Sequence, residues 1–393
     1  MKNIVKRILK SEKKLSRDIL KRISHYENIV RISNQDDKEN INVYSFQEGN
    51  KIYVSSGEDT FYFESNGPYK PEIQHMDFVA WIFLPVAMSK KKDLVIHGSG
   101  TQETKKNAER LSDIWACWLP KKYYLIKVHF KKYRQPDTTK KTKELLLFSG
   151  GVDSTYAIIN KSFKDKPDLL TIQGMDYRIS DQERFKKSIA KTNFLADQYA
   201  DQRLMIRSNA YDVYKKYSIP PRLTFVFVLA SASFLFSKSY RSVTMAADFA
   251  LYQQFEELPY GSSIATDQLY SSGDFSLETY GNDVTRAEKL PSIMSNKLAL
   301  KALSLCKDKK IRPENCGICS KCTRTKYMML AATGVIPTES FINPDLDLNA
   351  KINFNDNGDK QDAYIKSTYT TAFRNNNLKK IPNIVAEYKR IIS

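Results

Sequence analysis

Two groups of residues in this sequence have types and spacings that suit chemistry, and the first is a turn rich in serine and glycine. The turn is Ser149-Gly150-Gly151-Val152-Asp153-Ser154, and it lies within an apolar strand-to-helix pattern over Glu144–Asn160. Paired glycines let a ligand approach the backbone closely, and the free N–H groups of a first helical turn attract anions. The turn therefore predicts a phosphate-binding loop. The serine hydroxyls would add donors, and Asp153 would hold Mg²⁺ or polar ligand groups.

The second group is a cysteine cluster near the C-terminal end of the chain. Cys306, Cys316, Cys319 and Cys322 have the spacing C-x9-C-x2-C-x2-C. Two successive two-residue spacings wrap the backbone around one tetrahedral metal, and Gly317 permits the tight turn. The pattern predicts a closed four-cysteine zinc site with a structural role. An iron–sulfur cluster and a metal-free redox pair remain alternatives.

Composition favours a globular protein that contacts anions. The chain has 393 residues, 41% of them apolar, which suffices for two or three domains with a full core. A net charge of +18 favours tRNA, DNA or nucleotides as partners, although a solvated lysine-rich surface has the same composition. No stretch resembles a secretory signal or a bilayer span, and the few, clustered cysteines suit a reducing compartment. These features predict a cytoplasmic protein.

The N-terminal part, residues 1–135, is expected to form a smaller α+β domain whose role no motif reveals. Its elements are expected to be a basic amphipathic helix over residues 1–30, an antiparallel meander over 41–46, 51–55 and 60–63, a helix or loop over 77–88, a strand over 93–96, a helix over 102–118 and a strand over 122–130. The charged stretch 131–143 is the expected linker.

Residues 141–335 are expected to form a doubly wound parallel sheet. Strands over 145–148, 168–172, 203–206 and 243–246 alternate with helices, one of which is a buried helix over 223–236. Ligands bind at the carboxyl ends of the strands in such a sheet, so the turn at 149–154, Gly174 and Asp248 should converge. Asp248 would contact a substrate or metal, or else cap a helix. Residues 336–393 would form a helical or irregular extension.

The turn resembles the PP-loop, SGGxDS, of the ATP pyrophosphatases, and residues 144–335 resemble the 7-cyano-7-deazaguanine synthase family. Further similar features are the segment Ile219-Pro220-Pro221-Arg222, Asp248 after the fourth strand, the segment Thr285-Arg286-Ala287-Glu288-Lys289, and the four cysteines in number and order. The resemblance implies a Rossmann-like sheet of the adenine nucleotide alpha-hydrolase type, with ATP, Mg²⁺ and Zn²⁺ as cofactors.

The sequence also departs from this family. Leu223 stands where the family has asparagine, and Pro221 where it has glycine. The segment after Asp248 does not reproduce the family stretch expected to hold the deazapurine, and the N-terminal part is additional. The extended architecture also resembles longer relatives that serve antiviral defence. The resemblance therefore supports the use of ATP and the binding of zinc by this protein better than it supports the family's substrate.

The resemblance implies an adenylating enzyme. A substrate carboxylate or amide oxygen, on 7-carboxy-7-deazaguanine or a related compound, would attack the α-phosphate of ATP and release pyrophosphate. A protein amine is an alternative acceptor of the activated group. The nucleotide would lie on Ser149, Gly150, Gly151, Val152, Asp153, Ser154 and Gly174. The expected catalytic residues are Ser149, Asp153, Asp248 and the cations Arg222 and Lys289, with Arg286 as a further candidate cation.

Two other functions remain open at this stage. One is a tRNA-modifying enzyme of the thiolating type, which the positive charge favours but which needs a cysteine outside the metal site. The other is a nucleotide-binding sensor or scaffold without turnover. A homodimer is compatible with each function.

Overall fold

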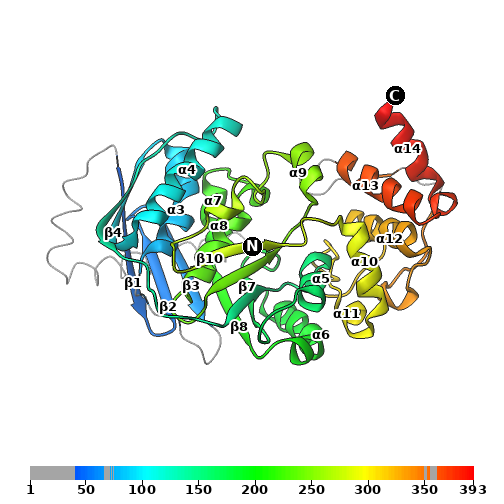
Figure 1. The fold of residues 1–393 in the computed structure, drawn as a ribbon, viewed down its shortest axis with the longest axis horizontal. Coiled ribbons are helices and arrows are strands. Elements are labelled where there is room, and N and C mark those ends of the chain that lie inside the picture. The colour runs from blue at the N-terminus through cyan, green and yellow to red at the C-terminus, as the bar shows by residue number, and fades with distance from the viewer. Residues whose placement is uncertain (1–39, 66–70, 72, 74, 349–351, 355–360) are drawn as a thin grey trace, which may run out of the picture.

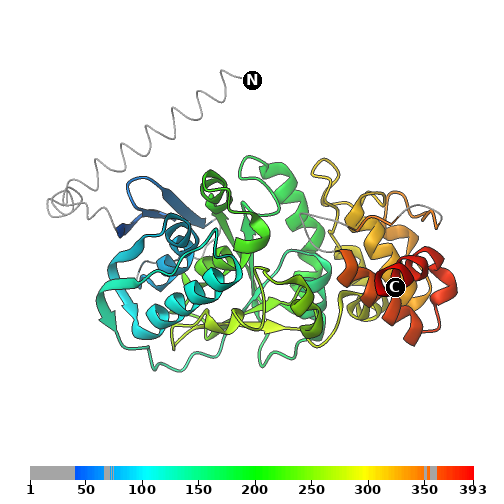
Figure 2. The same ribbon diagram turned by 90° about the horizontal axis from the view of Figure 1, so that it is seen from above.

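The computed structural model describes residues 40–393 apart from 66–70, 72, 74, 349–351 and 355–360. Ten strands form one sheet, mostly parallel, in the order β10-β9-β6-β7-β8-β3-β2-β1-β4-β5. The sheet occupies one end and the centre of the molecule, and helices α10 to α14 form the other end (Figure 1). From above, the red C-terminal helices again lie opposite the blue N-terminal elements (Figure 2). The protein is therefore mixed α/β, as the sequence predicts.

The strands after residue 143 are parallel to one another. They are β6 (Glu144–Leu147), β7 (Asp168–Gln173), β8 (Arg203–Ser208), β9 (Ser242–Ala246) and β10 (Ser276–Tyr280). From β6 the chain adds β7 and β8 on one side, and then β9 and β10 on the other. In parallel sheets, ligands bind outside the carboxyl ends of the two strands where the order reverses. Here those strands are β6 and β9, which precede the serine–glycine turn and Asp248.

The N-terminal strands continue the same sheet. They are β1 (Asn40–Glu48), β2 (Lys51–Ser55), β3 (Thr60–Ser65), β4 (Asp93–Thr101) and β5 (Val128–Arg134). The first three form the expected antiparallel meander. β3 also pairs with β8, so the sheet crosses the expected boundary between residues 1–135 and 141–335 without a break. The division into domains stays a prediction.

The helices cover both sides of this sheet. The α-helices are α3 (Asp77–Lys90), α4 (Gln102–Trp118), α5 (Val152–Asn160), α6 (Gln182–Tyr199), α7 (Ala210–Lys216), α8 (Pro221–Phe234), α9 (Leu251–Glu257), α10 (Arg286–Ser295), α11 (Lys297–Ala302), α12 (Ser320–Thr333), α13 (Gln361–Arg374) and α14 (Pro382–Ile392). Short 3-10 helices span Asp267–Leu269, Thr338–Ser340 and Leu378–Lys380. α3 packs on α4 and α8, whereas α10 packs on α5 and α12, and α13 on α12 and α14.

The apolar run of β6 is explained by two cores that meet at this strand. Leu145 and Leu147 belong to the core that includes α3, α4 and α8. Leu146 belongs to the second core, which includes α5 and α10 to α14. Because alternate residues of a strand face opposite sides, a strand buried on both faces needs an unbroken apolar sequence. The turn after β6 is therefore fixed from both sides.

Some predicted elements differ from the structure. The strand expected over 122–130 begins only at Val128, because preceding backbone N–H groups bond elsewhere: Tyr123 N donates to Leu119 O, and Tyr124 N to Met88 O. β5 then continues into the expected linker. β10 has no counterpart among the expected strands, since its sequence SLETY is mostly polar. The helix expected over residues 1–30 lies outside the described residues.

A buried ion cluster joins segments that are distant in sequence. Arg134, at the end of β5, donates to Asp77 at 2.8 Å and to Asp274 at 2.7 Å. Its side chain is 11% exposed, and each carboxylate is 3% exposed. Asp77 also accepts the backbone N–H and the hydroxyl of Thr101. Arg134 therefore ties the start of α3 to the loop before β10.

We predict that Arg134→Ala lowers the free energy of unfolding by about 3–5 kcal/mol, because it leaves two buried carboxylates without their cation. Urea unfolding followed by circular dichroism measures the change. Lys186→Ala is the control, since Lys186 forms only an exposed pair with Glu183 and its loss should cost about 0–1 kcal/mol. Equal losses in the two variants would contradict the assignment.

Candidate functional site

The serine–glycine turn connects β6 to the N-terminus of α5. Gly151 is the N-cap of α5, and Val152, Asp153 and Ser154 form its first turn, whose N–H groups have no partner within the helix. Ser149 Oγ lies 3.3 Å from Ser154 Oγ, so the two hydroxyls face each other across the turn. Gly150 has φ +74°, and a Cβ there would lie 2.9 Å from Thr192 Cγ2. The turn thus requires glycine at 150 and presents N–H groups and hydroxyls together.

Asp153 is held by two cations from α10. Arg286 Nε donates to Asp153 Oδ2 at 3.0 Å, and Lys289 Nζ lies 3.0 Å from Asp153 Oδ1. The Lys289 side chain is fully buried and also donates to the Ala247 carbonyl. Residues three apart lie on the same face of a helix, so one face of α10 delivers both cations. Sequence reasoning selected each of these three residues, and the structure brings them together.

The local sequence explains why α10 begins where it does. Thr285 is the N-cap, and its hydroxyl accepts from Glu288 N at 3.3 Å. The Glu288 carboxylate accepts from Thr285 N at 2.8 Å, which completes a capping box. In the segment Thr285–Lys289, the threonine and glutamate therefore fix the helix start. The side chains of Arg286 and Lys289, in the same helical turn, contact Asp153.

Asp248 joins the same cluster from the end of β9. Its Oδ1 lies 3.3 Å from an Arg286 nitrogen, and its Oδ2 accepts from Tyr260 OH at 2.8 Å. It does not cap a helix, because the N-cap of α9 is Ala250. The alternative interpretation of Asp248 as a helix cap is therefore wrong. Arg286 lies between the carboxylates that follow the two central strands.

Three members of the ion cluster, Asp153, Asp248 and Arg286, have shifted pKa values. Burial opposes ionisation of Asp153, but Arg286 and Lys289 outweigh it and lower the Asp153 pKa. Burial and the nearby charge of Asp153 raise the pKa of Asp248. Burial also opposes the charge on Arg286, yet the carboxylates raise its pKa well above the ordinary value. The pKa values of the two carboxylates are thus shifted in opposite directions.

A third acidic residue, Asp176, lies beyond β7 and pairs with Arg312. The Arg312 guanidinium lies 3.1 Å from Asp176 and lowers its pKa to about 2. Burial raises the pKa of Tyr211, and the charges of Asp176 and Asp248 add to that shift. Sequence reasoning did not select Asp176 or Arg312. Asp176 follows the last residue of β7 by three positions, and this place near a strand end was the available signal.

Gly174 and Arg222 are placed differently from the loop residues. Gly174 has φ +109°, and a Cβ there would lie 1.9 Å from Ser208 O, so close packing against the end of β8 requires glycine. Arg222 Nη1 donates to the Pro259 carbonyl at 3.3 Å. Its contacts in the described chain connect it to the segment around Tyr260 and not directly to Asp153. The roles predicted for both residues remain predictions.

Helix α13 brings Tyr364 to the far side of Arg286. Tyr364 OH lies 3.5 Å from Arg286 Nη1, and the Arg324 guanidinium lies 3.8 Å from the centre of the Tyr364 ring. Arg374, also on α13, pairs with Glu288 of the α10 capping box at 2.8 Å. The C-terminal extension thus supports the helix that carries the cations. No local signal in the sequence indicated this contact.

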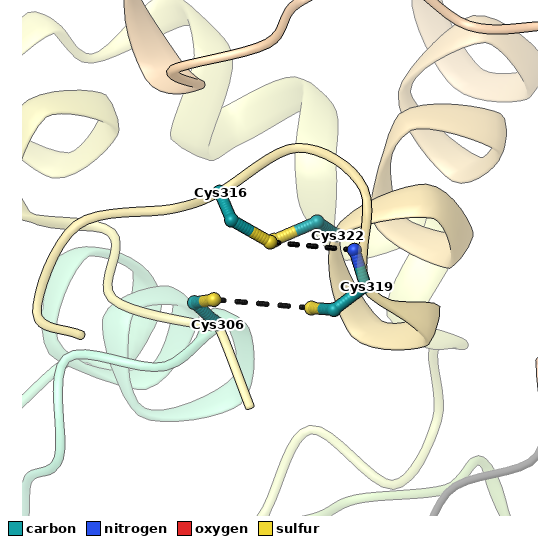
Figure 3. A group of neighbouring side chains, drawn as sticks. All are labelled: Cys306, Cys316, Cys319 and Cys322. Carbon is teal, nitrogen blue, oxygen red and sulfur yellow. Dashed lines mark hydrogen bonds between the residues drawn. The ribbon is translucent and has the colours of Figure 1, made fainter. Parts of the chain in front are cut away.

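The four cysteines gather at the N-terminus of α12 (Figure 3). Their sulfur atoms all lie within 4.8 Å of one another, and three of the residues are buried. Cys319 is the N-cap of α12 and Cys322 lies in its first turn, where the helix dipole favours thiolates. Gly317 has φ +83°, and a Cβ there would lie 1.9 Å from Asn343 O, so the turn between the cysteines requires glycine.

The cluster has the dimensions of a tetrahedral metal site. Zn–S bonds of about 2.3 Å place the sulfur atoms of a tetrahedron about 3.8 Å apart. The Cys306–Cys319 and Cys316–Cys322 sulfur distances are both 3.8 Å. Four soft ligands on one tetrahedron suit zinc, and they leave no position for a water molecule. The four cysteines could therefore bind a metal such as zinc.

Comparisons with protein-family models, with curated proteins and with solved structures gave no match to this chain. Within the described residues, no helix has the length and apolar character required to cross a membrane. Membership of the PP-loop ATP pyrophosphatases therefore stays a prediction from the sequence motifs.

We predict that Cys322→Ser abolishes stoichiometric metal binding, because the variant loses one of the four thiolate ligands of a tetrahedral site. Metal analysis of the purified protein should find about one zinc per wild-type chain and much less in the variant. Cys117→Ser is the control, since Cys117 is exposed on α4 and outside the cluster. Visible absorption by the wild type would instead indicate an iron–sulfur cluster.

Proposed function

We propose that this protein binds ATP at the 149–154 turn and transfers its adenylyl group to an acceptor, with release of pyrophosphate. The observation that carries the proposal is the cluster of Asp153, Arg286 and Lys289 beside this turn, at the reversal in strand order. A Rossmann-like sheet of the adenine nucleotide alpha-hydrolase type is part of the same proposal. So is membership of the PP-loop ATP pyrophosphatases.

The turn supplies the contacts that a triphosphate needs. The N–H groups at the start of α5 and the hydroxyls of Ser149 and Ser154 would donate to phosphate oxygens. Mg²⁺, when bound, would neutralise phosphate charge, with Asp153 as its carboxylate ligand and Asp248 as a second carboxylate nearby. Asp153 and Asp248 both contact Arg286, so one nucleotide could reach both carboxylates. Their role is to position the phosphates in line with an attacking oxygen.

The ion cluster also provides cations for the transition state. Without ligand, Arg286 and Lys289 neutralise Asp153, so the fully buried charge of Lys289 is compensated. When a nucleotide occupies the turn, its phosphates become competing anions for the same two cations. Arg286, which already contacts Asp153 and Asp248, would then stabilise charge that develops on the α-phosphate. The same cations would neutralise part of the negative charge of the departing pyrophosphate.

The proposed acceptor of the adenylyl group rests on the family resemblance, and no residue contact in the structure is used to choose it. A carboxylate on 7-carboxy-7-deazaguanine or a related heterocycle would attack the α-phosphate, and ammonia or another amine would then displace AMP. The departures at Pro221 and Leu223, together with the distinct segment after Asp248, favour a related acceptor over the family's own substrate.

A tRNA-thiolating activity is the second candidate, favoured by the charge of +18. Sulfur transfer needs a cysteine that is free to react. The structure gathers four of the five cysteines into one cluster, which leaves Cys117 on α4. Adenylation of a small molecule therefore agrees better with the arrangement of the cysteines.

We predict that Asp153→Asn reduces pyrophosphate release from ATP by about 100-fold or more, because the variant loses the carboxylate that would hold Mg²⁺. A coupled pyrophosphate assay with and without 7-carboxy-7-deazaguanine measures the rate. Asp165→Asn is the matched control, because Asp165 is exposed beyond α5, and its rate should not change. Full activity in Asp153→Asn would contradict the proposed site.

A further inference from the structure

The segment that precedes the first metal-site cysteine forms the wall behind the serine–glycine turn. Ser304 N donates to the Gly150 carbonyl at 2.8 Å. A Cβ at Gly150 would lie 3.5 Å from Ala302 O and 3.8 Å from Ser304 Cβ. Ser304 is fully buried, and Cys306 follows it by two residues. Any movement of this segment would therefore alter the turn directly.

Hydrogen bonds from the loop between Cys306 and Cys316 hold the backbone around Ser304 in place. Asn315 accepts from Leu305 N at 2.9 Å and donates to the Leu303 carbonyl at 3.1 Å. Its side chain is 3% exposed, so these hydrogen bonds are shielded from water. Asn315 directly precedes Cys316. One residue adjacent to a metal ligand thus fixes the backbone on both sides of Ser304.

Arg312 connects the same loop to the edge of the sheet. Its Nη2 atom lies 3.1 Å from Asp176 and 3.5 Å from the Ser304 carbonyl. Arg312 is 9% exposed, and its Nε atom has no acceptor among the described residues. The guanidinium also lies 5.0 Å from the centre of the Tyr177 ring. Arg312 therefore links three parts: the loop, the Ser304 backbone and the residues after β7.

We propose that metal binding at the four cysteines sets the affinity of the 149–154 turn for nucleotide, through Arg312 and Asn315 as positioning residues. This inference rests on the proposed nucleotide site. A metal that joins Cys306 to Cys316 closes the loop 307–315 and reduces its conformational freedom. With the loop closed, Arg312 and Asn315 hold Ser304 against Gly150. Without the metal, the hydrogen bonds of Arg312 and Asn315 alone would have to offset the conformational entropy of the loop.

A purely structural metal would behave differently. It would stabilise the C-terminal helices but leave the turn unaffected in any chain that stays folded. The two roles separate in a variant that keeps the metal and loses only the inner contacts of the loop. Arg312→Gln is such a variant, because Arg312 is not a metal ligand. Lys191→Gln is its matched control, since Lys191 contacts Glu314 and Pro313 on the outer side of the same loop.

The test measures ATP binding by isothermal titration calorimetry with Mg²⁺, together with the zinc content and melting temperature of each protein. We expect Arg312→Gln to retain zinc but to raise the Kd for ATP about tenfold, the size expected for lost charged hydrogen bonds. Lys191→Gln should bind ATP as the wild type does, and Arg312→Lys should recover part of the affinity. Removing zinc from the folded wild type should weaken ATP binding, and adding zinc should restore it.

The outcomes distinguish this inference from the proposed function. If the wild type binds ATP and zinc-loaded Arg312→Gln binds it with a Kd within twofold, the inference is wrong and the proposed site stands. Equal losses in Arg312→Gln and Lys191→Gln would also overturn it, because they would show general loosening of the loop. If the zinc-loaded wild type binds no ATP, the proposed function fails and the inference fails with it.

Discussion

Ion pairs between one carboxylate and two cations join two helices at the centre of this molecule. Asp153 starts α5, and Arg286 and Lys289 start α10, so their ion pairs join the first turns of two helices that are more than 130 residues apart. Removing one partner from such a cluster leaves an uncompensated buried charge, which is costly. The cluster therefore fixes how α5 meets α10, and with it the position of the turn at 149–154.

Three sets of contacts surround this cluster and the turn beside it. β6 is buried on both faces, so the turn that follows it has little freedom. Tyr364 on α13 and the capping box of α10 hold Arg286 from the far side. Ser304, which precedes the cysteine loop, donates to the Gly150 carbonyl, and Arg312 within the loop contacts the Ser304 carbonyl. Catalytic groups need support from the residues around them, because a small displacement of a reacting group lowers the reaction rate steeply.

Much of the candidate site could be predicted from sequence, because its signals are local. The turn at 149–154 combines an apolar strand, paired glycines and a helix start within a few residues, and the cysteine spacing is equally short. Asp248 followed from strand order, since parallel strands end at a common edge. Arg312 and Tyr364 could not be found in this way, because their roles depend on contacts with residues more than 70 positions away. The start of β5 and the whole of β10 were missed for a similar reason: tertiary hydrogen bonds, and not local propensity, decide them.

The most direct test of this account is the identity of the products formed from ATP labelled at the α-phosphate. With Mg²⁺ and a carboxylate-bearing deazapurine, thin-layer separation should show the label in AMP or in an adenylated acceptor, with pyrophosphate in equal amount. Label in ADP would contradict the account, because it would mean that the β–γ bond breaks and that the turn does not direct attack at the α-phosphate.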